Sequence, residues 1–175
     1  NIKFFRGSEE NVMNRVICAA KKYKIDLVVE ITGDCPVIDS EIISQCLEMY
    51  LKNKVEYVTN CHRRSYPDGM DVQVYKLNTL IKSSKMTNSR LDKEHVTLYI
   101  RNNPKKFKTI HMLPPENIYW PELGLTLDDI KDYKLLKKII EYFYKKNNKF
   151  FSCLDIINFL QKNKKIRNIN KSVRR

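Results

Sequence analysis

The stretch that decides the fold is Leu27-Val28-Val29-Glu30-Ile31-Thr32-Gly33-Asp34-Cys35-Pro36-Val37-Ile38-Asp39. Its first six residues are rich in β-branched side chains, which predicts a buried strand that ends at Gly33. Pro36 stiffens the turn that follows, and a helix is predicted to start near Asp39 or Ser40. The stretch therefore predicts a strand–loop–helix unit of an α/β protein.

Asp34 stands at the carboxyl end of this predicted strand. In open α/β sheets, ligands bind outside the carboxyl ends of the strands, and the glycine before Asp34 lets backbone approach a ligand closely. A carboxylate in this place is a candidate Mg²⁺ ligand for a phosphate-bearing substrate. The alternative is that Asp34 only caps the following turn, and the spacing does not decide between the two.

Apolar periodicity extends the pattern over the rest of the chain. The early alternation of strands and helices predicts a parallel sheet flanked by helices, and later strands without long helices between them predict a mixed edge. We expect helices over about 8–23, 40–53, 77–86, 91–102, 129–146 and 152–162, and strands over about 2–5, 27–32, 55–59, 70–75, 107–113 and 125–127.

Composition places the chain among globular proteins. With 175 residues, 42% hydrophobic and 30% charged, it can bury the core of one ordinary domain. No apolar run approaches the length of a membrane span, and no signal peptide is visible. The five cysteines form no C-x-x-C pair, which fits a reducing cytoplasm and argues against a zinc site. We therefore expect a cytoplasmic protein.

Positive charge is concentrated at the C-terminal end. The net charge is +13, and residues 161–175 hold seven basic side chains and no acidic one. We divide the chain into a domain over 1–163 and a basic tail over 164–175. Such a tail can contact nucleic acid, anionic lipid or polyphosphate. Because it lacks interleaved aromatic residues for stacking, we favour a solvated, frayed terminus.

A second group of carboxylates follows the apolar triplet 125–127. Asp128 would end a short strand, and Asp132 lies one helical turn later. Carboxylates from two strand ends can hold one Mg²⁺, with water and phosphate oxygens completing its shell. The alternative is that Asp128, Asp129 and Asp132 only favour a helix N-terminus through its dipole.

Three further motifs are weaker. Tyr66-Pro67-Asp68-Gly69-Met70-Asp71 contains a strong turn signal and is either a plain turn or a substrate-recognition loop. Glu94-His95 lies on a predicted helix without the second His of a metalloprotease, so His95 either contacts an acidic substrate or simply packs. Arg6 could contact an anion where a helix starts near Ser8. With four glycines, the chain has no Gly-rich loop followed by Lys to hold a triphosphate.

Six blocks of sequence stand out between about Phe5 and about Tyr144. They are Phe5–Glu9 with Arg15, Ile31–Asp39, Tyr57–Asn60, Tyr66–Val72, Glu94–Thr97, and Leu125–Asp128 with Asp132-Tyr133. Their order and spacing, more than any one motif, resemble the spore-coat polysaccharide biosynthesis branch of the cytidylyltransferase family, which includes the enzymes that activate sialic acid and 3-deoxy-manno-octulosonate.

The resemblance implies an α/β fold of the nucleotide-diphospho-sugar transferase type (GT-A, Rossmann-like), with a mixed sheet flanked by helices. It implies Mg²⁺-dependent transfer of CMP from CTP to an acidic sugar for cell-surface polysaccharide biosynthesis, and it allows a homodimer. Nothing favours nucleic acid or membrane insertion. Asp34 matches the metal-binding aspartate of the family, and Asp128 its second acidic position. No residue is assigned as catalytic. Substrate contacts are expected from Arg6, Thr32, Tyr66, Asp68, Gly69, Asp71, Glu94, His95 and Asp132.

The chain also departs from the family pattern. Family members begin with a strand and a loop of Arg, Gly, Ser and Lys that binds the triphosphate, and no stretch here matches it. We therefore expect an N-terminally truncated copy or fragment that does not turn over CTP alone. Glu30, Gln73 and Gly124 stand where relatives often carry Arg, Glu and Arg, which bears on sugar specificity. The alternative is a non-catalytic binding or assembly domain, and a nucleic-acid binder acting through its tail ranks last.

Overall fold

The structure is a computed structural model, and it describes residues 2–173. The chain divides into two compact units, and each is described by itself. Unit 1 comprises Asn1–Glu30, Cys46–Thr59 and Gln73–Ile110. Unit 2 comprises Ile31–Gln45, Asn60–Val72 and His111–Arg175. Within the described part of the chain, no helix has the length and apolar character needed to cross a membrane.

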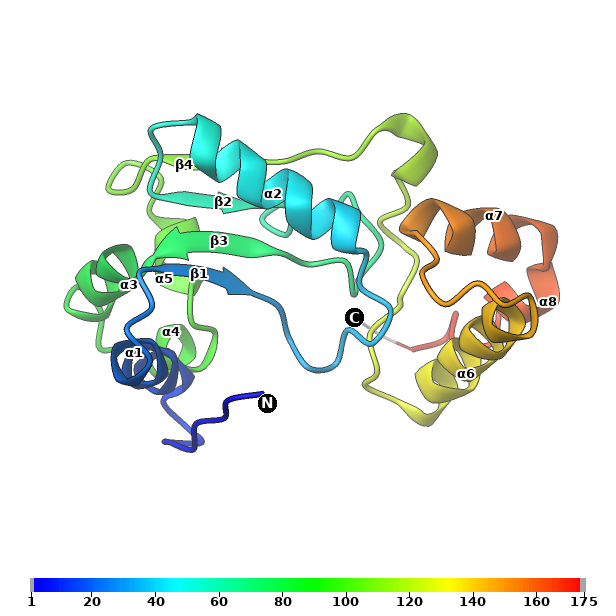
Figure 1. The fold of residues 1–175 in the computed structure, drawn as a ribbon, viewed down its shortest axis with the longest axis horizontal. Coiled ribbons are helices and arrows are strands. Elements are labelled where there is room, and N and C mark those ends of the chain that lie inside the picture. The colour runs from blue at the N-terminus through cyan, green and yellow to red at the C-terminus, as the bar shows by residue number, and fades with distance from the viewer. Residues whose placement is uncertain (1, 174–175) are drawn as a thin grey trace. The chain divides into compact units, whose positions relative to one another are not determined.

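The sheet is mixed, as the sequence predicts. Its strands are β1 (Leu27–Glu30), β2 (Tyr57–Thr59), β3 (Gln73–Lys76) and β4 (Thr109–His111), in the order β1-β3-β2-β4. β3 runs antiparallel to both β1 and β2 (Figure 1). The prediction that the mixed part lies at an edge is wrong, because the antiparallel strand stands between two others. The segment 60–72 is short and holds no crossover helix, so it can deliver β3 only antiparallel to β2.

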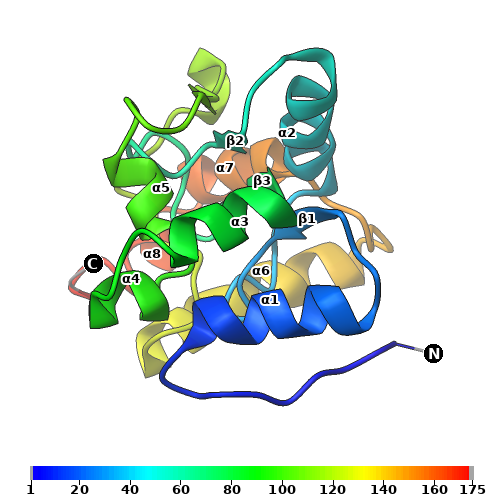
Figure 2. The same ribbon diagram turned by 90° about the vertical axis from the view of Figure 1, so that its left-hand side faces the viewer.

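Helices cover both faces of this sheet in unit 1. α1 (Val12–Lys22) and α3 (Leu77–Ser84) lie on one face, and α2 (Ser40–Lys52), whose second half belongs to unit 1, lies on the other (Figures 1 and 2). Burial of the apolar face of each helix supplies most of its stability. The core on the α1 side consists of Met13, Ile17, Tyr57, Tyr75, Leu80, Val96, Ile100 and Phe107.

Unit 2 is built on two capped helices. Asp129 caps α6 (Ile130–Lys145) and Ser152 caps α7 (Cys153–Lys162), each within a capping box. The helices pack through aromatic rings, among them the stacked pair Tyr142–Phe159 with centroids 4.1 Å apart. The unit also holds a 3₁₀ turn, η1 (Glu116–Ile118), and the short helix α8 (Lys164–Arg167).

Three local predictions are wrong. Residues 2–5 form no strand, and the triplet 125–127 lies beside a single parallel bridge between Asp68 and Gly124 instead of forming one. The helix predicted over 91–102 is two helices, α4 (Arg90–Glu94) and α5 (Leu98–Asn102), separated at Val96, which has φ 21°. A positive φ at a β-branched residue ends a helix, so Glu94-His95 lies at a helix end.

The basic tail is folded as far as the structure describes it. Residues 164–167 form α8, and Asn170 is buried with 4% of its surface exposed. Interpreting this segment as a frayed terminus is therefore wrong for residues 164–173. Arg174 and Arg175, which the predicted tail includes, lie outside the described residues, and the boundary after residue 163 stays a prediction.

Candidate functional site

The loop after β1 holds Asp34 half-buried. Its turn is closed by the N–H of Cys35, which donates to the Thr32 carbonyl at 3.3 Å. Burial raises the pKa of the Cys35 thiol to about 11, so the thiol is neutral and unreactive at ordinary pH. Asp39 ends the loop, and its carboxylate accepts backbone N–H groups of Glu41 at 2.8 Å and Cys153 at 2.7 Å. The loop is thus held at its far end, and Thr32 and Asp34 lie on its outer part.

A backbone hydrogen bond joins the two segments that carry the predicted metal ligands. The N–H of Leu127 donates to the Asp34 carbonyl at 2.9 Å, and both segments belong to unit 2. Asp128 follows directly and is exposed, and its carboxylate has no hydrogen-bond donor within the described residues. Asp34 and Asp128, 94 positions apart in the chain, therefore stand on neighbouring segments of one unit.

The other two acids of this group, Asp129 and Asp132, stabilise the N-terminus of α6. The carboxylate of Asp132 is fully buried and accepts the N–H groups of Asp128 at 3.3 Å and Asp129 at 3.0 Å. Its second oxygen accepts a hydrogen bond from the Asn170 amide at 2.7 Å. The helix-terminus alternative is thus confirmed for Asp129 and Asp132. Substrate binding by Asp132 stays a prediction that its burial does not favour.

The donor set at Asp34 and Asp128 fits a hard divalent cation. Mg²⁺ is held by one or two carboxylates and keeps water or phosphate oxygens as its other ligands. Two carboxylates on adjacent segments meet this requirement. No group of three or more His, Cys, Asp or Glu side chains suited to a metal occurs in residues 2–173, so an all-protein cage for another metal is not formed there.

The predicted loop 66–71 is a tight turn packed on the segment before Asp128. Asp68 pairs with the backbone on both sides, accepting from Leu125 at 2.6 Å and donating to Leu123 at 2.8 Å. Gly69 has φ 102°, and a Cβ there would lie 2.7 Å from the Leu125 carbonyl carbon. Only glycine fits this approach. Tyr66 is buried at 1% exposure.

Arg64, which no sequence motif singled out, neutralises Asp68 and Asp71 of this loop. Its guanidinium pairs with Asp68 at 3.0 Å and with Asp71 at 2.7 Å. Burial lowers the pKa of Arg64, but Asp71 and Asp68 outweigh burial and raise it. A charge-assisted fork of this kind orders the loop. The substrate roles of Asp68 and Asp71 stay predictions.

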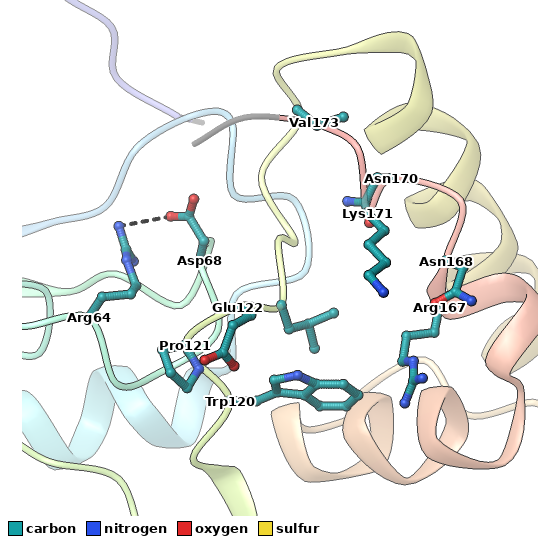
Figure 3. A pocket seen from close by; sticks show the side chains of 11 residues that line it. Arg64, Asp68, Trp120, Pro121, Glu122, Arg167, Asn168, Asn170, Lys171 and Val173 are labelled. Atoms are coloured by element: carbon teal, nitrogen blue, oxygen red, sulfur yellow. Dashed lines mark ion pairs between the residues drawn. The ribbon is translucent and has the colours of Figure 1, made fainter.

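An open pocket of about 830 Å³ lies beside this loop, within unit 2 (Figure 3). Arg64 and Asp68 form one wall, Trp120 and its neighbours form the floor, and the segment after α8 forms the opposite wall. Its walls come from three distant segments of the chain, which explains why no sequence pattern predicted it. The one sequence feature that could have indicated this pocket is Trp120, the single tryptophan, which lies within a Pro-rich irregular segment.

Comparison with known proteins now assigns the family. A model of the family described as "Cytidylyltransferase" matches residues 1–171. The chain belongs to the cytidylyltransferase family. The resemblance seen in the sequence is thereby confirmed, and it covers the chain almost to its end.

Relatives and a solved structure agree. An uncharacterized protein of Methanocaldococcus jannaschii is 38% identical over 173 residues, which is 99% of this chain and 69% of that protein. The spore coat polysaccharide biosynthesis protein SpsF of Bacillus subtilis is 30% identical over 140 residues, 79% of this chain and 57% of SpsF. A cytidylyltransferase from Leptospira borgpetersenii superposes with a TM-score of 0.88 at 36% identity, covering 98% of this chain and 70% of that one. The α/β cytidylyltransferase fold with a mixed sheet is thus shown.

The remaining predicted site residues of this cytidylyltransferase family member belong to unit 1. Arg6, Glu94 and His95 are exposed there, and His95 caps α4 through its N–H, which donates to the Leu91 carbonyl at 2.9 Å. Their substrate roles stay predictions.

Two of the departures from the family pattern are neighbours in unit 1. Glu30 and Gln73 are cross-strand partners of β1 and β3, and the Gln73 amide donates to the Glu30 carboxylate at 3.4 Å. The two side chains are thus hydrogen-bonded to each other across the strands, and their bearing on sugar specificity stays a prediction.

Proposed function

We propose that this cytidylyltransferase family member takes part in the Mg²⁺-dependent transfer of CMP from CTP to an acidic sugar. The reaction would take place in the cytoplasm, and the activated sugar would be used to build a cell-surface polysaccharide. The hydrogen bond between Leu127 and Asp34 carries the proposal, because it sets the segments of Asp34 and Asp128 side by side. The similarity to the spore coat polysaccharide biosynthesis protein SpsF supports a role in polysaccharide biosynthesis. A bound Mg²⁺ would neutralise charge on the phosphates of CTP.

The protein's own contribution is to position and to orient. The Asp39 carboxylate fixes the end of the loop that carries Asp34, and the Asp132 carboxylate holds the backbone of Asp128. Carboxylates that are already fixed in place would hold a Mg²⁺ without reorganisation, and the cation would then offset the negative charge of the phosphates.

Metal binding tests the proposal on the chain itself. Mn²⁺, a paramagnetic substitute for Mg²⁺ at carboxylate sites, is titrated with and without CTP while water-proton relaxation is measured. We expect Asp34→Asn and Asp128→Asn each to weaken Mn²⁺ binding about tenfold or more, since each removes one of two charged ligands. Glu116→Gln, which removes an exposed acid of the same unit, is the control and leaves binding unchanged.

Transfer is tested in a chimera. The part of the Leptospira cytidylyltransferase that this chain matches is replaced by this chain, and pyrophosphate release is followed with CTP and acidic sugars. We expect activity that either aspartate substitution lowers by about two orders of magnitude or more. Activity that survives both substitutions contradicts the proposal. A chain that binds no Mn²⁺ supports the alternative, a non-catalytic binding domain of the same fold.

A further inference from the structure

The connection between α6 and α7 in unit 2 exposes an aromatic side chain to solvent (Figure 1). Phe150 has 97% of its surface exposed, although its neighbours are fixed in place. Phe151 stacks on Phe143 with ring centroids 4.4 Å apart, and Ser152 caps α7. The N–H of Phe150 donates to the Asn148 side chain at 3.2 Å. The loop is therefore ordered, and it leaves Phe150 outside the core.

The turn before Phe150 is tight as well. Asn147 has φ 56°, a left-handed conformation that asparagine tolerates and that ends α6. The N–H of Asn147 donates to the Tyr144 carbonyl at 2.9 Å, and that of Asn148 to the Phe143 carbonyl at 3.0 Å. Residues 147–150 thus form an ordered projection at the end of α6, which we call the 147–150 tip.

A second exposed ring lies beside the tip. Tyr144, in the last turn of α6, is exposed and lines the same shallow hollow as Lys149 and Phe150. A single exposed apolar side chain is ordinary on a protein surface. Two exposed aromatic rings in one hollow form an apolar patch, and no aromatic contact covers either ring within the described residues.

Lysines flank this patch. Residues 130–150 hold seven lysines and two acids, of which Asp132 is buried and Glu141 pairs with Lys137 at 3.9 Å. Lys145 and Lys149 make no ion pair within residues 2–173. The helix dipole favours a lysine at position 145, but it does not account for Lys149, which lies beyond the helix. The tip therefore combines free cations with exposed rings.

Helical spacing extends the positive charge along α6. Lys134, Lys138 and Lys145 are four and seven residues apart, so they lie on one side of the helix, and all three are exposed. Lys137 precedes Tyr144 by seven residues and shares its stripe. The exposed face of α6 thus carries lysines along its length and an aromatic ring near its C-terminal end.

Charge and shape select the kind of partner. A second copy of the chain, related by a two-fold axis, would place lysines against lysines. A nucleic acid strand stacks its bases on successive aromatic faces, whereas the Tyr142 ring of this helix is covered by Lys146 and Phe159. An anionic lipid surface accepts both components, because aromatic side chains lie at headgroup level and lysines contact anionic headgroups.

We propose that the 147–150 tip and the lysine side of α6 dock this protein on the surface of an anionic lipid bilayer. Phe150 and Tyr144 enter the headgroup region, and Lys145 and Lys149 contact the anionic headgroups. The protein lies on the bilayer and does not cross it. This docking goes beyond the proposed transfer reaction and is tested without CTP, sugar or metal.

Vesicle cosedimentation measures the docking. The full chain is mixed with vesicles of phosphatidylglycerol and phosphatidylcholine, or of phosphatidylcholine alone, at about 0.1 M salt. We expect binding to the anionic vesicles that weakens as salt is added, and at least about tenfold weaker binding to the neutral vesicles. Equal binding to both, or no binding to the anionic vesicles, overturns the proposal even if the metal and transfer experiments succeed.

Variants of the tip assign the aromatic contact. Phe150→Ser should weaken vesicle binding about tenfold, because it removes the ring that enters the headgroup region. Leu113→Ser is the matched control, since Leu113 is an apolar residue of the same unit that is also exposed, at 64%. Both sites are exposed, so denaturant unfolding should show unchanged stability for both. Equal weakening by Leu113→Ser overturns the docking site.

The lysines are tested as a pair. Lys145→Gln combined with Lys149→Gln should weaken binding to anionic vesicles by more than about tenfold, since each lysine near the surface contributes about fivefold. Lys164→Gln combined with Lys165→Gln removes the same charge from α8 and is the control. Equal weakening by this control would show a general charge effect and contradict the site.

A fluorescent reporter separates insertion of the ring from adsorption by charge. Trp120→Phe removes the single tryptophan, and either Phe150→Trp or Leu113→Trp is added to that variant. Brominated lipids should quench the emission of the tryptophan at position 150 and leave that at position 113 unquenched. A bound protein whose tryptophan at position 150 is not quenched contradicts the role of the tip.

Soluble partners are the last comparison. We expect Phe150→Ser to leave binding to heparin and to duplex DNA unchanged while it weakens vesicle binding. If it weakens both equally, the face binds polyanions in general. If the chain forms a dimer that Phe150→Ser dissociates in sedimentation equilibrium, the face belongs to a second copy. Either result overturns the assignment to a lipid surface.

Discussion

In unit 1 the buried polar side chains around Gln73 satisfy one another, although the buried Ser83 hydroxyl has no partner within the described residues, whereas in unit 2 several exposed or half-buried polar side chains keep donors or acceptors free. In unit 1 the Gln73 amide oxygen accepts from Thr97 and, at 2.7 Å, from the Tyr57 hydroxyl, while the Gln73 amide nitrogen and the Tyr75 hydroxyl donate to Glu30. Such a closed network rigidifies a core. In unit 2, Asp128, Arg167 and the Trp120 N–H stay available beside ordered backbone.

This contrast indicates where binding is to be sought. A buried polar group without a partner costs free energy, so evolution closes networks that serve only the fold. Open groups on ordered segments cost little where solvent reaches them, and they keep their hydrogen-bonding capacity for a ligand. By this criterion we propose that the Gln73 network of unit 1 serves the fold and that the open polar side chains of unit 2 are candidates for binding. Three substitutions test the division, from the largest expected effect to the smallest.

The turn at Gly69 is the most sensitive point of unit 2. A Cβ at this position would lie 2.7 Å from the Leu125 carbonyl carbon and 2.8 Å from its oxygen, at φ 102°. Gly69→Ala should therefore cost about 3 kcal/mol in the free energy of unfolding, from backbone strain and collision together. Denaturant unfolding measures it.

Gly33→Ala is the matched control for that substitution, because nothing lies within 4 Å of a Cβ at Gly33. We expect its free energy of unfolding to stay within about 0.5 kcal/mol of the unsubstituted protein. Equal effects of the two alanines would mean that the loop 66–71 is not held against the segment before Asp128.

Asn170 ties the last segment of unit 2 to the loop of Asp128. Asn170→Ala removes two buried hydrogen bonds, one to the Gly124 carbonyl and one to the Asp132 side chain, and should cost about 2–3 kcal/mol. Asn168→Ala, at an exposed neighbour, should change the free energy of unfolding little. Because Asp132 also holds the Asp128 backbone, we expect Asn170→Ala to weaken Mn²⁺ binding as well. Unchanged stability and metal affinity would show that this segment is loosely attached.

How far the sequence predicts this structure depends on whether the signal is local. The helices α2, α6 and α7 carry their periodicity and caps within a few residues, and their predicted ranges agree with the structure. The break between α4 and α5 at Val96 depends on packing, since Val96 is buried with 5% of its surface exposed. No local sequence signal therefore predicts this break. The antiparallel placement of β3 likewise depends on its partners.

The candidate site follows the same rule. Asp34 and Asp128 could be selected because each follows an apolar run, and the family pattern places both. Their juxtaposition needs the hydrogen bond from Leu127, which joins residues far apart in sequence. The pocket depends on Arg64, Trp120 and Arg167 meeting in space, and the basic composition of the last segment pointed to a solvated tail instead. Contacts between residues that lie far apart in the chain produce no local periodic pattern in the sequence.

The smallest expected effect concerns the closed network of unit 1. Burial raises the pKa of Glu30 above its ordinary value of 4.5, although the hydrogen bond from Tyr75 lowers it. When the pKa of an acid is raised in the folded state, ionisation of that acid lowers the free energy of unfolding of the protein. Below the ordinary pKa this loss is absent, because the acid is neutral in both the folded and the unfolded state. Glu30→Gln removes this titration. On acidification through the range between the raised pKa and 4.5, the unsubstituted protein should therefore gain stability relative to Glu30→Gln.

Glu48 in the same unit gives a control of opposite sign. The hydrogen bond and charge of Lys52 lower the pKa of this exposed carboxyl group, so its contribution is present above 4.5 and is lost as the pH falls. Denaturant unfolding of Glu30→Gln and Glu48→Gln at a series of pH values should then show the two variants diverging from the unsubstituted protein in opposite directions. A pH-independent difference for Glu30→Gln would mean that solvent reaches Glu30. In that case the network of unit 1 would be open, like the pocket of unit 2, and burial of polar groups would no longer separate structure from function in this chain.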